Sequence, residues 1–226
     1  MTKWLDGWTI VFDLDGTLVD TAPDLLGALN HVLEQDGLEP VDLSLIATMI
    51  GHGARAMIEK GLRYRGVAPE EPVLDAHFNR FLVYYSEHIA EGSRPFDRAE
   101  AILEELAGAG ALLAVCTNKK QDLTDQLLDA LHLTPRFSAI LGADSVPNRK
   151  PDGDHIIRTI IAAGGDPSRA VMVGDSRTDE RAARNAGLPF IFVPFGYEIE
   201  SVDDIGADAV IMHYSELPSA LSRLIG

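Results

Sequence analysis

Short apolar runs alternate with helical patterns along most of the 226 residues, and this alternation constrains the fold more than any other feature. Strands that alternate with helices of about 10 to 15 residues build βαβ units, and therefore a parallel sheet with helices on both faces. Uninterrupted apolar strands suit a sheet that is buried on both sides. The predicted strands are Thr9–Phe12, Leu112–Cys116, Ser138–Leu141, Val171–Val173, Phe190–Val193 and Ala209–Met212.

Residues 21 to 91 break the alternation, because every pattern in this stretch is helical. Thr21 is a candidate N-cap with Pro23 in the first turn after it, and apolar residues from Leu25 to Leu33 then recur at helical spacing. A block of this length exceeds a simple crossover between two strands. We therefore predict a doubly wound (Rossmann-like) parallel-sheet core formed by residues 1–20 and 92–226, with an inserted all-helical cap domain at residues 21–91.

The composition argues against several classes of protein. The net charge is −16 and no Lys/Arg cluster appears, which disfavours a nucleic-acid partner. No apolar run approaches the ~18 residues that span a bilayer, and the N-terminal residues lack the apolar segment of a signal peptide. A single cysteine, Cys116, provides no internal disulfide framework, so we expect a cytoplasmic protein without a membrane partner. The acidity weakly repels anions, so an anionic substrate needs local cations.

The segment Asp13-Leu14-Asp15-Gly16-Thr17 directly follows the first predicted strand and carries the clearest chemical signal. Two carboxylates this close raise each other's energy unless a cation or a proton intervenes. Gly16 lets the chain turn sharply after them. This arrangement predicts a bound metal ion, Mg²⁺, and chemistry on an anion. The alternative for this pentapeptide alone is an Asp-rich turn.

Further polar residues follow other predicted strands, where an open α/β sheet binds its ligands. Thr117 and Asn118 come after the second strand, and the segment 174–179 comes after the strand at Val171–Val173. Lys150 precedes a predicted helix and can enter the same crevice. Together these residues provide a hydroxyl, an amide, an ammonium group and further carboxylates for a reaction centre.

Each of these residues also has a purely structural interpretation. Thr117 can be an ordinary polar strand end, and Lys150 a solvated lysine before a helix. Asp175 can be a helix N-cap, with Asp179 a surface charge on the same helix. Cys116 alternates with Thr117 along its strand, so we assign it to the core and not to catalysis. The functional interpretation rests on the whole set, because the structural one requires several independent coincidences.

Four motifs in order resemble those of the haloacid dehalogenase superfamily of phosphohydrolases, and the likeness covers essentially the whole chain. The helical insertion right after the first motif is similar to that family's helical cap of the first type. Asp15 stands where dehalogenase- and phosphonatase-type relatives carry tyrosine or alanine, so the resemblance implies cleavage of phosphate esters. The motifs are Asp13-Leu14-Asp15-Gly16-Thr17, Cys116-Thr117-Asn118-Lys119, Lys150-Pro151 and Gly174-Asp175-Ser176-Arg177-Thr178-Asp179.

The resemblance implies a role for each reacting residue. Asp13 would be the nucleophile that forms an aspartyl-phosphate. Asp15 would protonate the leaving alkoxide and then deprotonate the hydrolytic water. Thr117 and backbone amides would hold the phosphoryl oxygens, and Asn118 would bind substrate. Lys150 would neutralise charge on the nucleophile and the phosphoryl group.

A metal site is implied at the same motifs. Mg²⁺ would be held by Asp13, by the backbone carbonyl of Asp15, and by Asp175, and it would clamp the phosphoryl group as charge develops. Asp179 would either bind the metal through water or position Lys150. All of these residues follow from the resemblance and not from their spacing alone.

Three segments are similar to the phosphoglycolate phosphatase group within that superfamily: residues 15–25, 116–119 and 182–187. This similarity favours 2-phosphoglycolate as the substrate, hydrolysed to glycolate and phosphate. In the predicted cap, Arg55 lies close to the glycine-flanked His52 and would pair with the substrate carboxylate, and His52 would contact substrate as well. The alternatives are an incidental Arg55 at a helix start and a capping or solvent-exposed His52.

Other functions are compatible with the same core. A phosphosugar mutase would pass the aspartyl-phosphate to a second hydroxyl, although the segment Thr21–Asp24 lacks the histidine expected there. A pyrophosphatase or nucleotidase would use the same residues on another ester or anhydride. A non-catalytic sensor has no need for an acid/base carboxylate, so the intact motifs argue against it. The expected partner is a small phosphorylated metabolite, bound by a monomer or a homodimer.

Overall fold

The computed structural model describes residues 3–46, 49–50, 53–197 and 201–226. It divides into two compact units: an α/β unit formed by Met1–Asp20 and Pro95–Gly226, and a helical unit formed by Thr21–Arg94. The sequence places the end of the helical segment at residue 91, whereas the unit in the structure ends at Arg94. In the described part of the chain no helix is long and apolar enough to cross a membrane.

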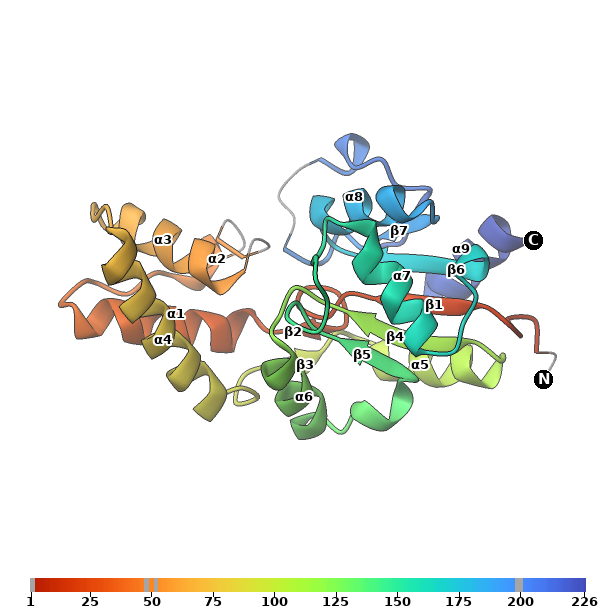
Figure 1. Ribbon diagram of the computed structural model, residues 1–226, viewed down its shortest axis with the longest axis horizontal. Helices are drawn as coiled ribbons and strands as arrows, with labels where there is room; N and C mark the ends of the chain where they lie inside the picture. Colours follow the sequence, from red (N-terminus) through yellow and green to blue (C-terminus); the bar gives the residue numbers. More distant parts are fainter. Residues whose placement is uncertain (1–2, 47–48, 51–52, 198–200) are drawn as a thin grey trace. The chain divides into compact units, whose positions relative to one another are not determined.

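A six-stranded sheet forms the centre of the α/β unit, in the order β5-β4-β1-β6-β7-β8 (Figure 1). Every neighbouring pair is parallel, so the predicted α/β class with a parallel sheet is confirmed. The chain order reverses at β1, and such a reversal is where α/β sheets bind ligands. The strands are β1 (Thr9–Phe12), β4 (Leu112–Cys116), β5 (Ala139–Leu141), β6 (Ala170–Gly174), β7 (Phe190–Phe192) and β8 (Ala209–Val210).

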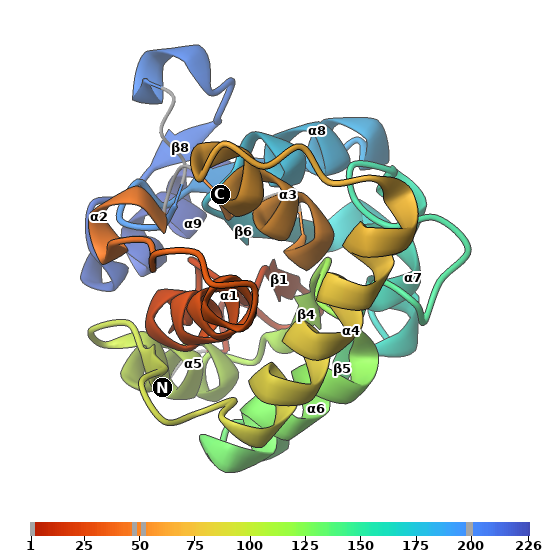
Figure 2. The same ribbon diagram turned by 90° about the vertical axis from the view of Figure 1, so that its left-hand side faces the viewer.

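Helices cover both faces of this sheet. Figure 2 shows α7 (Gly153–Ala162) and α8 (Arg177–Ala186) on one side of it, and α5 (Ala99–Gly108) and α9 (Leu217–Ile225) on the other. The helix α6 (Gln121–Ala130) packs beside β5. Short 3₁₀ turns complete the unit at Thr134–Arg136, Pro167–Arg169, Val202–Asp204 and Tyr214–Glu216.

The apolar core beneath α7 and α8 joins residues of four strands to the inner faces of the two helices. Val11 and Met172 contribute from the central strands, and Ile156 and Ile160 contribute from α7. Cys116 is fully buried in this core, and burial raises the pKa of its thiol to about 12. The thiol therefore stays protonated, as its assignment to the core requires.

The register of the three central strands brings polar residues to one edge. Phe12 pairs with Val115 of β4 and with Val173 of β6. Because parallel strands point the same way, Asp13, Thr117 and Asp175 all follow their strands at this carboxyl edge. A second sheet contains only β2 (Val19–Asp20) and β3 (Arg94–Pro95), whose two-residue strands are too short to leave a pattern in the sequence.

The helical unit contains α1 (Ala22–Gln35), α2 (Leu43–Ile46), α3 (Ala54–Tyr64) and α4 (Glu71–Glu87). Helix α1 packs against both α3 and α4. Its approach to α3 depends on Gly61, where a Cβ atom would lie 2.9 Å from Leu29 Cδ1. Helix α2 ends at Ile46, and residues 47–48 lie outside the described part.

Candidate active site

Asp13 and Lys150 form the centre of the site. Asp13 directly follows β1, and its backbone N–H donates to Val173 O of β6 at 3.0 Å. The Lys150 ammonium donates to Asp13 Oδ1 at 2.7 Å and to Asp179 Oδ1 at 2.6 Å. Only 1% of the Lys150 side chain is exposed. A fully buried ammonium is therefore shared between two carboxylates that lie far apart in the sequence.

Three buried carboxylates crowd around this ammonium. Asp13, Asp175 and Asp179 each offer an oxygen, and these oxygens lie within 4.8 Å of one another. Burial raises the pKa of Asp13 to about 7 against the opposing charge of Lys150, and Asp179 adds to the rise. Burial, and after it the charges of Asp179 and Asp13, also raise the pKa of Asp175 well above its ordinary value. The cluster has more negative charge than Lys150 balances, and its oxygen donors suit a hard divalent cation.

The Asp175 carboxylate is fixed by two donors. Thr17 Oγ1 donates to Asp175 Oδ1 at 3.0 Å, and the backbone N–H of Tyr197 donates to Asp175 Oδ2 at 2.7 Å. Gly16 allows this approach, because a Cβ atom there would lie 2.3 Å from Asp175 Oδ2 and its φ is +84°. The glycine and threonine of the first motif thus hold the aspartate of the fourth motif.

Asp179 is the third residue of helix α8 (Arg177–Ala186) and also contacts Lys150. Ser176 is the N-cap, and its hydroxyl and backbone N–H meet Asp179 Oδ2 at 2.6 and 3.2 Å. The structural alternative that placed the N-cap at Asp175 is wrong, because α8 begins at Arg177 after a Ser176–Asp179 capping box. The other oxygen of Asp179 contacts Lys150, which matches the positioning role and not a surface charge.

The Asp15 carboxylate is paired with Lys119, a residue of the second motif for which the sequence predicted no role. Lys119 Nζ contacts Asp15 Oδ1 at 2.9 Å and Oδ2 at 3.3 Å. The Lys119 side chain is 5% exposed and the Asp15 side chain 20%. The two carboxylates of the first motif therefore have different cations, Lys150 for Asp13 and Lys119 for Asp15. Lys119 belongs to the second motif, so its position after a strand end was the available signal.

Thr117 and Asn118 connect the second motif to its neighbours. The backbone N–H of Thr117 donates to Leu141 O at 3.1 Å, and its hydroxyl accepts from the N–H of Lys119 at 3.1 Å. Asn118 Nδ2 donates to the Lys150 carbonyl at 2.9 Å. Among the described residues, the buried Asn118 Oδ1 has no hydrogen-bond partner. A buried acceptor in this state favours a bound molecule that donates to it.

The sequence also predicted two site residues in the helical unit, Arg55 and His52. Arg55, 39% exposed, contacts the carboxylates of Glu71 and Asp75 within the helical unit. These pairs give Arg55 a structural explanation, and its contact with substrate stays a prediction. His52 lies outside the described residues.

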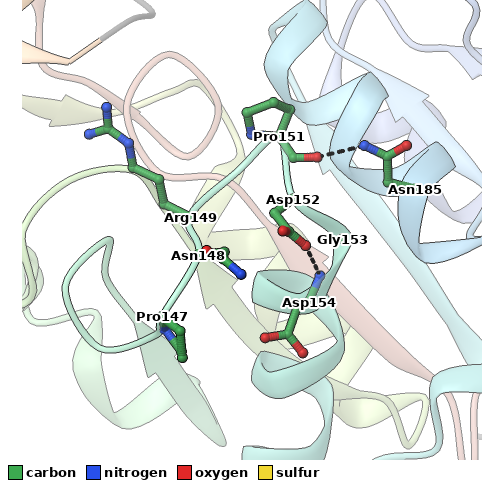
Figure 3. A pocket seen from close by; sticks show the side chains of 8 residues that line it. All are labelled: Pro147, Asn148, Arg149, Pro151, Asp152, Gly153, Asp154 and Asn185. Carbon is green, nitrogen blue, oxygen red and sulfur yellow. Dashed lines mark hydrogen bonds between the residues drawn. The ribbon is translucent and has the colours of Figure 1, made fainter.

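A pocket is lined by the loop residues on either side of Lys150 (Figure 3). Residues 147–149 and 151–154 line it together with Asn185, whose side chain donates to the Pro151 carbonyl at 2.9 Å. The Lys150 side chain itself contacts Asp13 and Asp179 instead. The pocket therefore does not mark the reaction centre, which is identified by its buried charges.

The arrangement can transfer a group between oxygen atoms. Asp13 offers an oxygen beside a fixed ammonium, and Asp15 offers a second carboxylate with a separate cation. The carboxylate cluster can hold a divalent cation next to Asp13. A buried nucleophile, an acid/base group and charge stabilisation at one strand edge are the components of a hydrolytic active site.

Comparisons with known proteins agree with this geometry. The family model of the haloacid dehalogenase-like hydrolases matches residues 10–193. A phosphoglycolate phosphatase of Caulobacter vibrioides is 48% identical over 221 residues, which cover 98% of this chain and 93% of that protein. A phosphoglycolate phosphatase of Agrobacterium fabrum is 44% identical, over 93% of this chain and 91% of that protein. A crystal structure described as a predicted phosphoglycolate phosphatase from Haemophilus somnus matches with a TM-score of 0.87 at 28% identity, over 98% of this chain and 99% of that one.

Proposed function

The chain belongs to the haloacid dehalogenase-like hydrolase family, and we propose that it is a Mg²⁺-dependent phosphatase that converts 2-phosphoglycolate to glycolate and phosphate. One observation carries the proposal: Asp13 and Lys150 contact each other at 2.7 Å inside a buried cluster of carboxylates. A carboxylate in such a cluster is a costly structural element and a suitable nucleophile for a phosphoryl group.

The reaction proceeds in two steps on this chain's own residues. An oxygen of Asp13 forms a bond to phosphorus, and the bond from phosphorus to the leaving oxygen breaks while Asp15 gives that oxygen a proton. Asp15 then takes a proton from water as the water attacks phosphorus, which releases phosphate and restores Asp13. Lys150 balances the charge of Asp13 and of the phosphoryl oxygens throughout.

Mg²⁺ fits the donors of the site. Asp13 and Asp175 would hold it through their side chains, since Asp179 directs its oxygens to Lys150 and Ser176. When bound, Mg²⁺ supplies charge neutralisation for the phosphoryl oxygens. The backbone carbonyl of Asp15 is the further ligand that the family resemblance implies.

Two observations support phosphoglycolate as the ester. The relatives at 48% and 44% identity carry that activity in their names. Lys119 also places a positive charge beside Asp15, where the leaving group departs, and this favours a leaving group with its own negative charge. Arg55 is proposed as a second cation for the same carboxylate.

Phosphate release tests the proposal. Release should be measured from 2-phosphoglycolate, sugar phosphates, nucleotides and pyrophosphate, with Mg²⁺ and with excess chelator. We expect a Mg²⁺-dependent preference for phosphoglycolate and loss of turnover in Asp13→Asn, with Glu104→Gln, an exposed acid of α5, as the control. Activity on other esters but not on phosphoglycolate would show that the substrate is a different ester. Full turnover in Asp13→Asn would show that Asp13 is not the nucleophile.

We also propose that the enzyme acts in the cytoplasm on a free metabolite, as a monomer or homodimer. The single cysteine is buried and compatible with a reducing compartment. Light scattering of the purified protein measures its oligomeric state, and fractionation of the source cells locates it.

A further inference from the structure

His155 is a fully buried imidazole next to the main chain of Lys150. It is the third residue of α7, and its exposed fraction is 0%. Its Nδ1 accepts from the backbone N–H of Lys150 at 3.3 Å. Its Nε2 lies 3.2 Å from the carbonyl oxygen of Leu141, the last residue of β5.

These two partners define the protonation of the ring. A backbone N–H only donates and a carbonyl only accepts, so Nδ1 carries a lone pair and Nε2 carries the proton. Burial, followed by the charge of Lys150, lowers the pKa of His155 to about 4 against the weaker opposing effects of Leu141, Asp154 and Gly142. The ring is therefore the neutral Nε2–H tautomer at neutral pH, and a second proton would remove the bond to Lys150.

His155 connects two of the catalytic motifs. The Leu141 carbonyl that it meets also accepts the N–H of Thr117 at 3.1 Å. On the other side, the Lys150 carbonyl accepts from Asn118 Nδ2 at 2.9 Å. The N–H and the carbonyl of Lys150 are thus both held by side chains, which fixes the point from which its long side chain reaches Asp13 and Asp179.

We propose that His155 is a positioning residue that holds the Lys150 ammonium between Asp13 and Asp179 through its bond to the Lys150 main chain. The inference rests on the proposed phosphatase activity, because that activity gives Lys150 its role. Lysine side chains are flexible, so an anchored main chain is needed to place a single ammonium on two carboxylates.

Two substitutions separate positioning from simple packing. The side chain of His155→Asn can place an oxygen where Nδ1 lies and keep the bond from Lys150, while it loses the donor to Leu141. The side chain of His155→Gln can place an amide N–H where Nε2 lies and keep the bond to Leu141, while it loses the acceptor for Lys150. Each variant loses one of the two hydrogen bonds, so a structural role predicts similar losses in both.

Steady-state kinetics with 2-phosphoglycolate and Mg²⁺, beside melting temperatures, compare the two variants. We expect His155→Gln to lower kcat by roughly 10- to 100-fold with little change in KM. The kcat of His155→Asn should be about tenfold higher than that of His155→Gln. Their melting temperatures should fall by similar amounts. Equal kcat values in the two variants would overturn the proposal.

A measurement without turnover separates this inference from the proposed function. In ¹⁵N NMR spectra at neutral pH, His155 should show the Nε2–H tautomer, and the Lys150 ammonium, assigned by its absence in Lys150→Met, should give a slowly exchanging signal. His155→Gln should broaden or shift that signal more than His155→Asn does. An Nδ1–H tautomer, or an unchanged Lys150 signal in His155→Gln, would reject the positioning role even for a chain that hydrolyses none of the tested esters.

Discussion

Lys150 shows at the scale of one residue how strongly the buried charges of this cluster act on one another. Removing an ammonium and two carboxylates from water costs several kcal/mol per ion, and their mutual attraction seldom recovers more than that. Asp13 and Asp179 nevertheless raise the pKa of Lys150 above its ordinary value despite its burial. The carboxyl of Asp13 in turn has a pKa near 7. Perturbed groups that occur together at a strand edge are typical of active sites.

Lys119 provides the first prediction. Lys119→Met removes the cation that holds the Asp15 carboxylate, so we expect kcat/KM for 2-phosphoglycolate to fall by roughly 10- to 100-fold. Lys119→Arg keeps the charge and should retain more activity. Steady-state kinetics test this, with Lys3→Met as the control for loss of an exposed lysine. Wild-type kinetics in Lys119→Met would show that this ion pair does not serve the reaction.

Which site residues the sequence can predict depends on whether they lie in a motif. Asp13 and Asp175 follow recognisable strand ends and Lys150 precedes a helix in its own motif, and the structure brings all three together. His155 has no such signal, because a histidine on an apolar helix face looks like any core residue. Its role depends on Lys150 N–H and Leu141 O, and these groups become its neighbours only when the parallel strands assemble.

Helix α8 illustrates how an element serves both folding and the site. Its negative residue at the third position, Asp179, accepts from Ser176 and also contacts Lys150. Apolar residues of this helix begin only at Ala182, but the capping box starts the helix at Arg177. The Ser176-x-x-Asp179 pattern is the local signal that periodicity overlooks.

Removal of this cap gives the second prediction. Ser176→Ala loses the hydroxyl that meets Asp179 Oδ2 at 2.6 Å, so we expect a loss of about 1 kcal/mol in the free energy of unfolding. Because Asp179 also holds Lys150, kcat should fall in the same variant. Urea unfolding and phosphate release measure the two effects, and Ser176→Thr, which keeps a hydroxyl, is the matched control. An unchanged kcat in Ser176→Ala would separate the cap from the reaction.

In the helical unit, the C-cap residue of α1 gives a prediction about pH. Burial alone would raise the pKa of Asp36, but hydrogen bonds from Arg80 and His77 outweigh it and place the pKa below its ordinary value of 3.8. Because its pKa is lowered, Asp36 stabilises the fold at pH values above 3.8. This contribution is lost as the pH falls through the lower pKa that Asp36 has in the folded state.

Asp36→Asn tests this sign. Because Asp36 is partly exposed, solvent screens the pairs, and we expect a loss of only about 0.5 to 1 kcal/mol at neutral pH. The difference from the wild type should shrink as the pH falls below 3.8 and vanish once Asp36 is protonated in the folded state. Urea unfolding followed by circular dichroism measures it, with Glu34→Gln as an exposed control on the same helix. A loss that does not depend on pH would assign the effect to packing.

The whole chain carries a net charge of −16, and part of that charge is concentrated at one buried cluster. The raised pKa of Asp13 means that the folded state binds more protons than the unfolded state between pH 3.8 and about 7. The metal-free protein should therefore lose stability as the pH rises through this window. A cation bound at the cluster would offset that loss, because it stabilises the ionised carboxylates.

Thermal unfolding with and without Mg²⁺ tests this coupling. A ligand that binds only the folded state at about 100 times its Kd adds about 2.7 kcal/mol, or roughly 5 to 10 °C in Tm for a chain of this size. Protons compete with the metal for Asp13 and Asp175. Because the pKa of Asp13 is about 7, the shift should be larger at about pH 8, where Asp13 is mostly ionised, than at about pH 6, where it is mostly protonated. Asp175→Asn should remove most of the shift, whereas Glu104→Gln should keep it. An equal shift at both pH values, or in Asp175→Asn, would place the Mg²⁺ outside this cluster.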